Sequence, residues 1–145
     1  MIQFFVEDVD FDTNTLSSVP TWLSSIVQSY QQSILEINYI FCSDEYLLSI
    51  NQEYLSHDFY TDIITFDNRD DTTQAIESDI IISIDRVPEN AARLDTPFLS
   101  ALLRVLVHGL LHILGFSDHS DEEKNEMRSL ENRYLELYFN LFHTL

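Results

Sequence analysis

The fold is decided by one stretch of the chain, Val107-His108-Gly109-Leu110-Leu111-His112-Ile113-Leu114-Gly115-Phe116-Ser117-Asp118-His119. It holds three of the five histidines and both glycines of the 145 residues. The apolar run before it contains no turn signal, and Thr96-Pro97 is a typical helix start. We therefore predict a buried helix from about Pro97 to Leu114, ended by Gly115 in a left-handed conformation.

Two histidines on this predicted helix have the spacing of metal ligands. His108 and His112 are four residues apart, which places their Cβ atoms roughly 5–6 Å apart on one face. One metal ion with bonds of ~2.0–2.1 Å can bridge that span. Because Gly115 turns the chain back, a residue shortly after it can supply a third ligand.

The third ligand is predicted from the register of the metzincin pattern H-E-x-x-H-x-x-G-x-x-H. The position ten residues after His108 is Asp118, and His119 is the next residue and the alternative ligand. Either side chain binds a borderline metal such as zinc. The glutamate base of the peptidase pattern is replaced by Gly109, which disfavours proteolysis. A core helix with two incidental histidines is the competing interpretation.

The segment H-G-L-L-H-I-L-G-F-S-D-H (residues 108–119) resembles the signature of the YbeY family, whose usual form is H-G-x-L-H-L-x-G-Y-D-H. The likeness continues in Asn51-x-x-Tyr54, Thr61-Asp62-Ile63-Ile64-Thr65-Phe66 and Asp79-Ile80-Ile81-Ile82-Ser83, and covers roughly residues 37–142. The resemblance implies a metal-dependent single-strand endoribonuclease of ribosomal RNA maturation and ribosome quality control. It also implies histidine ligands to zinc, one ion per chain, and a metzincin-like arrangement with a mixed sheet.

The chain departs from the family pattern at two positions. Ser117 is an extra residue before the Asp-His pair, so only His108 and His112 transfer directly as ligands. Leu55 follows Tyr54 where the family has a catalytic arginine. His57, two residues later, is either a partial substitute for that arginine or an ordinary surface histidine.

Composition indicates one globular domain over residues 1–145. Hydrophobic residues make up 45% of the chain, yet no apolar stretch approaches the ~20 residues of a membrane span. The N-terminus lacks the basic start of a signal peptide. The single cysteine, Cys42, excludes an internal disulfide and is typical of a reducing cytoplasm. We therefore expect a cytoplasmic protein with no membrane association; the sequence does not indicate its oligomeric state.

The charge restricts how the protein can bind RNA. The net charge is −18, and no lysine or arginine precedes Arg69. A broad basic surface for nucleic acid is therefore excluded, and contact with RNA must be local. Arg86 and Arg93, seven residues apart on a predicted helix, share a face. With Arg104 they are our candidates for a phosphate-binding patch, and ordinary surface charge is the alternative.

The remaining patterns predict an α+β fold in which a small sheet of about four strands packs against several helices. The strands are expected near residues 2–6, 36–42, 63–67 and 79–84. Helices are expected from Pro20, over 43–55, from Asp85, over 97–114 and after a capping box at Ser120-Asp121-Glu122-Glu123. The last helix carries an apolar stripe for core packing, at Met127, Leu130, Tyr134, Leu137 and Leu141.

The motif therefore predicts a metal-dependent hydrolase, and the family resemblance implies that its substrate is RNA, attacked by either an activated water or the RNA 2′-hydroxyl. The candidates for proton transfer are His57 and whichever of Asp118 and His119 is not the third ligand, which is His119 if Asp118 binds the metal. Ribosomal RNA or ribosomal particles are the expected partners, and ribosomal proteins are further candidates. Two alternatives are another metallohydrolase and a ribosome-associated binding protein with a structural or vestigial metal site.

Overall fold

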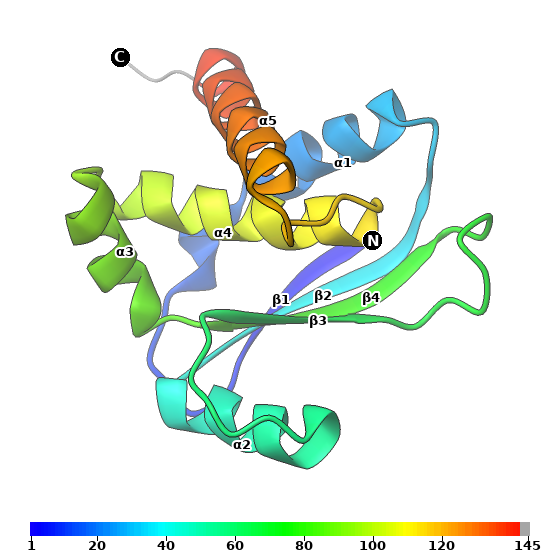
Figure 1. Cartoon of the computed structure of the whole chain (residues 1–145). Helices are drawn as coiled ribbons and strands as arrows, with labels where there is room; N and C mark the ends of the chain where they lie inside the picture. Colours follow the sequence, from blue (N-terminus) through cyan, green and yellow to red (C-terminus); the bar gives the residue numbers. More distant parts are fainter. Residues whose placement is uncertain (143–145) are drawn as a thin grey trace.

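Four strands pair into one mixed sheet in the computed structural model, which describes residues 1–142 (Figure 1). The strands are β1 (Ile2–Val6), β2 (Ile34–Cys42), β3 (Ile63–Asp67) and β4 (Ile76–Ser83). Their order in the sheet is β1-β2-β4-β3. β1 and β4 run parallel to the central strand β2, and β3 is antiparallel to β4. The predicted α+β class with a mixed sheet is confirmed, although β2 and β4 begin a few residues earlier than expected.

The helices occupy the predicted segments, with one short addition. They are η1 (Thr13–Leu16), α1 (Val19–Ser29), α2 (Asp44–Leu55), α3 (Arg86–Leu94), α4 (Phe98–Ile113) and α5 (Asp121–Leu141). Only the 3-10 turn η1 was not expected from the sequence. The predicted capping box is present, because the Ser120 hydroxyl accepts from the Glu123 backbone N–H while the Glu123 carboxylate accepts from the Ser120 N–H.

Among residues 1–142, no single helix is long and apolar enough to cross a membrane. The α3–α4 pair, bent by 109°, meets the length and composition test only when the two helices are counted together.

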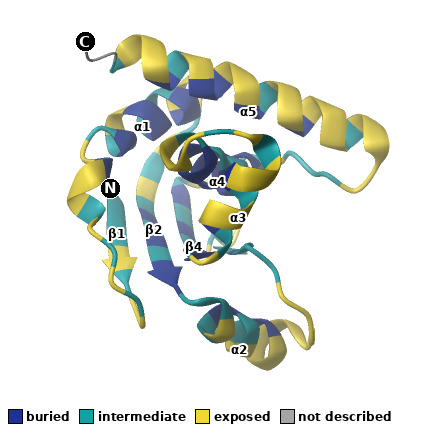
Figure 2. Cartoon of the chain, turned by 90° about the vertical axis from the view of Figure 1, so that its left-hand side faces the viewer, coloured by how far each residue is buried: buried dark blue, intermediate teal, exposed yellow. Residues whose placement is uncertain are grey.

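The two faces of the sheet are covered unequally. α1 and α4 lie side by side on one side of the sheet with α5 packed against both, and α2 lies on the opposite face (Figure 1). Because side chains alternate along a strand, Ile37, Tyr39 and Phe41 of β2 enter the large core on the α4 side. Cys42, the last residue of β2, belongs to a small cluster under α2. Figure 2 shows exposed residues on α2, on α3 and along the outer side of α5.

α4 approaches the sheet closely, and Gly109 permits this approach. A Cβ atom added at Gly109 would lie 2.8 Å from Ile63 Cδ1 and 3.0 Å from Ile80 Cγ2. The Tyr39 hydroxyl also crosses from the sheet and donates to the Leu106 carbonyl over 3.0 Å. Gly109 therefore places the helix against β3 and β4, in addition to replacing the glutamate of the peptidase pattern.

α5 is attached to α1 by polar contacts inside an otherwise apolar interface. Trp22 is fully buried, and its indole N–H donates to the Tyr134 carbonyl over 2.8 Å. The hydroxyls of Tyr30 and Tyr134 are 2.7 Å apart, as are those of Ser18 and Tyr138. These contacts set the position of α5, which crosses α4 beside its two histidines.

Candidate metal centre

α4 ends at Gly115 in the left-handed conformation that the sequence predicts, and this ending sets the direction of the following loop. Gly115 has φ +109°, a backbone conformation that side chains rarely adopt. The Gly115 N–H donates to the His112 carbonyl and the Phe116 N–H to the Leu111 carbonyl, both over 3.0 Å. This pair of bonds is the Schellman motif. The chain then doubles back toward the helix, so Asp118 reaches the histidine-bearing face.

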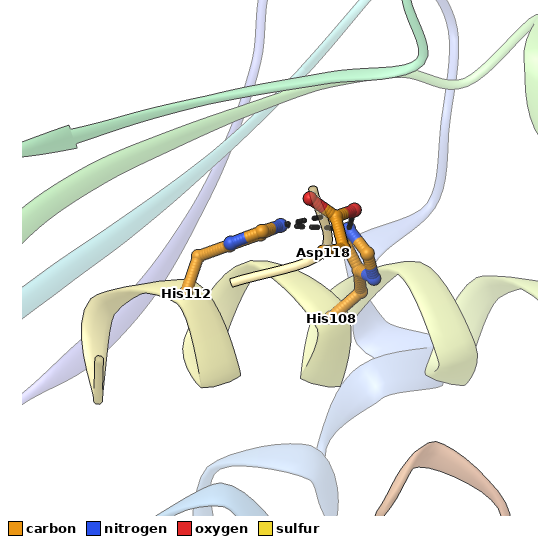
Figure 3. A group of neighbouring side chains, drawn as sticks. All are labelled: His108, His112 and Asp118. Carbon is orange, nitrogen blue, oxygen red and sulfur yellow. Dashed lines mark hydrogen bonds and ion pairs between the residues drawn. The ribbon is translucent and has the colours of Figure 1, made fainter. Parts of the chain in front are cut away.

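Three side chains converge at this point (Figure 3). The Nε2 atoms of His108 and His112 are 2.9 Å apart, and Asp118 Oδ2 is 3.6 Å from each of them. A tetrahedral ion with bonds of ~2.0–2.1 Å separates its ligand atoms by roughly 3.3–3.4 Å. The three observed distances bracket that value, so this group, the His108–His112–Asp118 cluster, fits a metal ion.

Each imidazole is oriented by a hydrogen bond on its other nitrogen. His108 Nδ1 is 2.6 Å from Glu131 Oε2, and His112 Nδ1 is 3.0 Å from the Phe116 carbonyl oxygen. Both acceptors favour a proton on Nδ1, which leaves the Nε2 lone pairs facing Asp118. Partners of this kind fix the ring orientation and the tautomer of metal-binding histidines.

Glu131, a residue that the sequence interpretation missed, lies at the centre of this support. It is buried in α5 and also accepts from Arg104 over 3.0 Å. A signal for it exists in the sequence, because Glu131 is four residues after Met127 and three before Tyr134. It is therefore a carboxylate on an otherwise apolar helix face, where an unpaired charge would be costly.

The two histidines have opposite pKa shifts. Burial lowers the pKa of His108, but the hydrogen bond and charge of Glu131, aided by Asp118, outweigh burial and raise the net pKa above its ordinary value. Burial and the neighbouring charge of His108 lower the pKa of His112. A metal ion needs unprotonated imidazole nitrogens, so its binding displaces a proton more readily from His112 than from His108.

Arg69 holds the C-terminal end of α4 in place, and it too was missed. Its side chain is 3% exposed and pairs with Asp67 at 2.7 Å. The same guanidinium donates to the Ile113 carbonyl over 3.0 Å. A cation at this position satisfies a helix-end carbonyl and complements the helix dipole. The β3–β4 connection is thereby linked to the start of the loop that carries Asp118.

The arginines predicted to bind phosphate do not all lie together. Arg93 and Arg104 line one cavity of about 180 Å³ with His108, and Arg128, which was not predicted, joins them. Arg86 lies elsewhere, paired with Asp44 at 2.8 Å and positioned over the Tyr60 ring. The spacing of seven residues between Arg86 and Arg93 therefore did not bring both guanidinium groups to one cavity.

The two histidines predicted to transfer protons occupy different places. His57 is exposed beyond the end of α2 and stacks on Phe59 with ring centres 5.0 Å apart. His119 is exposed next to Asp118, and its charge contributes to lowering the pKa of His112. Within the described residues, the structure brings Asp118 and neither of these histidines into the cluster. Leu55, the last residue of α2, is 39% exposed.

Comparison with known proteins gives matches over nearly the whole chain. Residues 2–138 match the family model described as "Endoribonuclease YbeY". A protein of that name from Cytophaga hutchinsonii is 49% identical over 136 residues, 94% of each chain. Another from Flavobacterium psychrophilum is 47% identical over 138 residues, 95% of this chain and 96% of that one. The solution structure of TM1509 from Thermotoga maritima aligns with TM-score 0.70 and 25% identity, covering 98% of this chain and 91% of that one.

Proposed function

The chain belongs to the YbeY family of endoribonucleases, and from this premise we propose that it cleaves single-stranded ribosomal RNA at the His108–His112–Asp118 cluster. The proposed role is ribosomal RNA maturation and ribosome quality control in the cytoplasm. Ribosomal particles and their proteins are then its partners. The observation that carries the proposal is the convergence of two imidazole nitrogens and one carboxylate oxygen at bridging distances.

Zinc, one ion per chain, is the metal that we propose for the cluster. Two imidazole nitrogens and a carboxylate oxygen are donors that zinc accepts, and three protein ligands leave one coordination position open. When bound, the ion supplies Lewis acidity toward a phosphoryl oxygen and toward water. Glu131 and the Phe116 carbonyl keep the two imidazoles in the orientation that this donor set requires.

The chain's own side chains would supply substrate binding and proton transfer. Arg93 and Arg104, with Arg86 more distant, are proposed to hold RNA phosphates, because contact must be local in a chain of net charge −18. Attack by water or by the 2′-hydroxyl removes one proton, and departure of the leaving oxygen requires another. His119, the residue after Asp118, is proposed to carry such a proton. His57 is proposed to act from the loop after α2.

Peptide hydrolysis is disfavoured by the packing of α4. In the zincin pattern the residue after the first histidine is a glutamate that acts as general base. Gly109 occupies that position here, and the space where its side chain would begin is filled by Ile63 and Ile80. No base is therefore available from this position.

The test compares metal content and RNA cleavage in the wild type and in His112→Ala. We expect about one zinc per wild-type chain by mass spectrometry and cleavage of a single-stranded RNA. His112→Ala should lose both, because it removes one of three ligands. His57→Ala is the control for metal content, since its ring lies outside the cluster, and it should keep the ion. Undiminished cleavage by a metal-free His112→Ala protein would overturn the proposal.

A further inference from the structure

The distribution of ion pairs separates the seven basic side chains into two groups. Arg69, Arg86 and Arg104 are each paired with a carboxylate. Within residues 1–142, the other four make no ion pair, and these are Arg93, Lys124, Arg128 and Arg133. Two of those four, Arg93 and Arg128, line the same cavity although they come from different helices, α3 and α5. The cavity is lined by three guanidinium groups and two carboxylates, so positive charge is in excess there although the chain has 25 acidic residues.

The carboxylates of the cavity are already engaged by other groups. Glu131 accepts from Arg104 and contacts His108 Nδ1. Asp62 accepts from the Asn90 side-chain amide over 3.4 Å. Arg93, by contrast, donates only to the uncharged Asn90 oxygen, over 3.2 Å. Arg93 and Arg128 are both exposed at the cavity, so an anion arriving from solvent can reach two free guanidinium groups.

We propose that this cavity is a subsite for a backbone phosphate of the RNA, held by Arg93 and Arg128 beside the phosphate that is cleaved. The inference rests on the proposed RNA substrate and adds Arg128 as a substrate-binding residue. Guanidinium groups bind phosphate oxygens through paired N–H donors, which gives both affinity and orientation. Arg104, which lines the same cavity, adds positive charge for phosphate binding, and its guanidinium is in addition bound to Glu131 and Asn132. It positions Glu131 behind His108.

The imidazole of His108 separates this subsite from the cluster. Its Nε2 atom faces Asp118 and His112, whereas its Nδ1 atom faces Glu131, which lines the cavity. A phosphate in the cavity is therefore a different phosphate from one bound at the cluster. Binding both requires an RNA strand that continues past the cleaved bond.

The test measures RNA binding and not cleavage. A fluorescently labelled single-stranded RNA is titrated with protein over a series of salt concentrations, in EDTA so that no cleavage occurs. Each phosphate contact contributes about 0.7 to the slope of log K against log salt for single strands. We expect Arg128→Gln and Arg93→Gln each to reduce that slope by about 0.7 relative to the wild type. Arg128→Lys, which keeps the charge, should retain the wild-type slope.

Arg133→Gln is the matched control, because it removes the same charge from the same helix outside the cavity. It should leave the slope unchanged, and thermal unfolding should show that all variants are folded. Three outcomes would overturn the subsite. The salt slope could be unchanged in Arg93→Gln and Arg128→Gln, or Arg133→Gln could reduce it as much as those two variants do. The wild type could also fail to bind the RNA. A wild type that binds with the expected slopes but fails to cleave RNA with zinc would instead overturn the proposed function.

Discussion

The cluster has a helical half, His108 and His112, and a loop half, Asp118, and the two are held in different ways. The histidines share α4, expose 22% and 26% of their side chains, and each has a hydrogen bond behind the ring. Asp118 exposes 36% of its side chain on the loop after Gly115. The helical half is fixed by the core of the fold, whereas the loop half depends on how a short connection closes. This difference predicts which changes are costly.

The largest effect is expected from removing the loop half, by Asp118→Ala compared with His119→Ala. Asp118 lies in the cluster and His119 does not, so Asp118→Ala should abolish stoichiometric zinc binding. The loss should exceed the roughly 10–100-fold that supporting residues contribute to metal affinity. His119→Ala should retain one zinc per chain, as measured by mass spectrometry after dialysis. The reverse result would assign the third ligand to His119.

A smaller effect is expected from Glu131→Gln, which weakens the support behind the helical half. The glutamine keeps the shape of the side chain but removes the charge that favours the Nδ1 proton of His108 and that pairs with Arg104. Zinc affinity should fall roughly 10–100-fold, measured by competition with a chelating dye.

The control for that change is Glu123→Gln, on the same helix. Glu123 closes the capping box and accepts from Ser117 in the loop, so it supports the loop half only indirectly. It should weaken zinc binding less than Glu131→Gln does. Equal affinities for Glu131→Gln and the wild type would show that His108 needs no support from α5.

The smallest effects are expected from replacing the two glycines by alanine, which should change the free energy of unfolding. Gly109 lies in the helical half and Gly115 at the start of the loop half. Gly109→Ala introduces a Cβ 2.8 Å from Ile63 Cδ1 and 3.0 Å from Ile80 Cγ2. The overpacking cost of about 1–3 kcal/mol should exceed the gain of up to ~1 kcal/mol from better helix propensity. Gly115→Ala has free space around its Cβ, so its cost of about 1–2 kcal/mol comes from the left-handed backbone alone.

Double mutants separate these two causes. Ile63→Val removes the Cδ1 atom nearest to the added methyl group, so it should partly rescue Gly109→Ala in urea unfolding. It should leave the effect of Gly115→Ala unchanged, because no atom outside the neighbouring residues lies within 4 Å of that position. Strictly additive free energies of unfolding for Gly109→Ala with Ile63→Val would contradict the close approach of α4 to β3.

The helices and strands, which have regular local residue patterns, were predictable from the sequence. Short β-rich or apolar runs located the strands, with an alternating pattern in the one near residues 36–42, and capping residues such as Ser43 and Ser120 located helix starts to within a few residues. The positions of His108 and His112 followed from helical spacing, and the turn at Gly115 followed from its residue type. Each of these inferences uses neighbours within about one helical turn, where periodicity applies.

What could not be predicted depends on contacts between distant segments. Glu131 lies 23 residues after His108 on another helix, and no local pattern links the two. Arg128 reaches the cavity only because α5 crosses α4. Arg86 has the spacing of a partner for Arg93, but Asp44, 42 residues earlier, binds its guanidinium. The metzincin register favoured Asp118 as the third ligand, but loop residues have no periodicity that would exclude the neighbouring His119.

The fluorescence of the buried Trp22 indole can report on the packing of α5. It is the single tryptophan of the chain, and its N–H is bonded to the backbone of α5. Separation of α5 from α1 would expose this ring to water and shift its emission to longer wavelength. The same helix carries Glu131, which holds the His108 ring. The emission wavelength of Trp22, recorded while urea is added, therefore reports whether α5 still packs against α1 and so whether Glu131 stays in place.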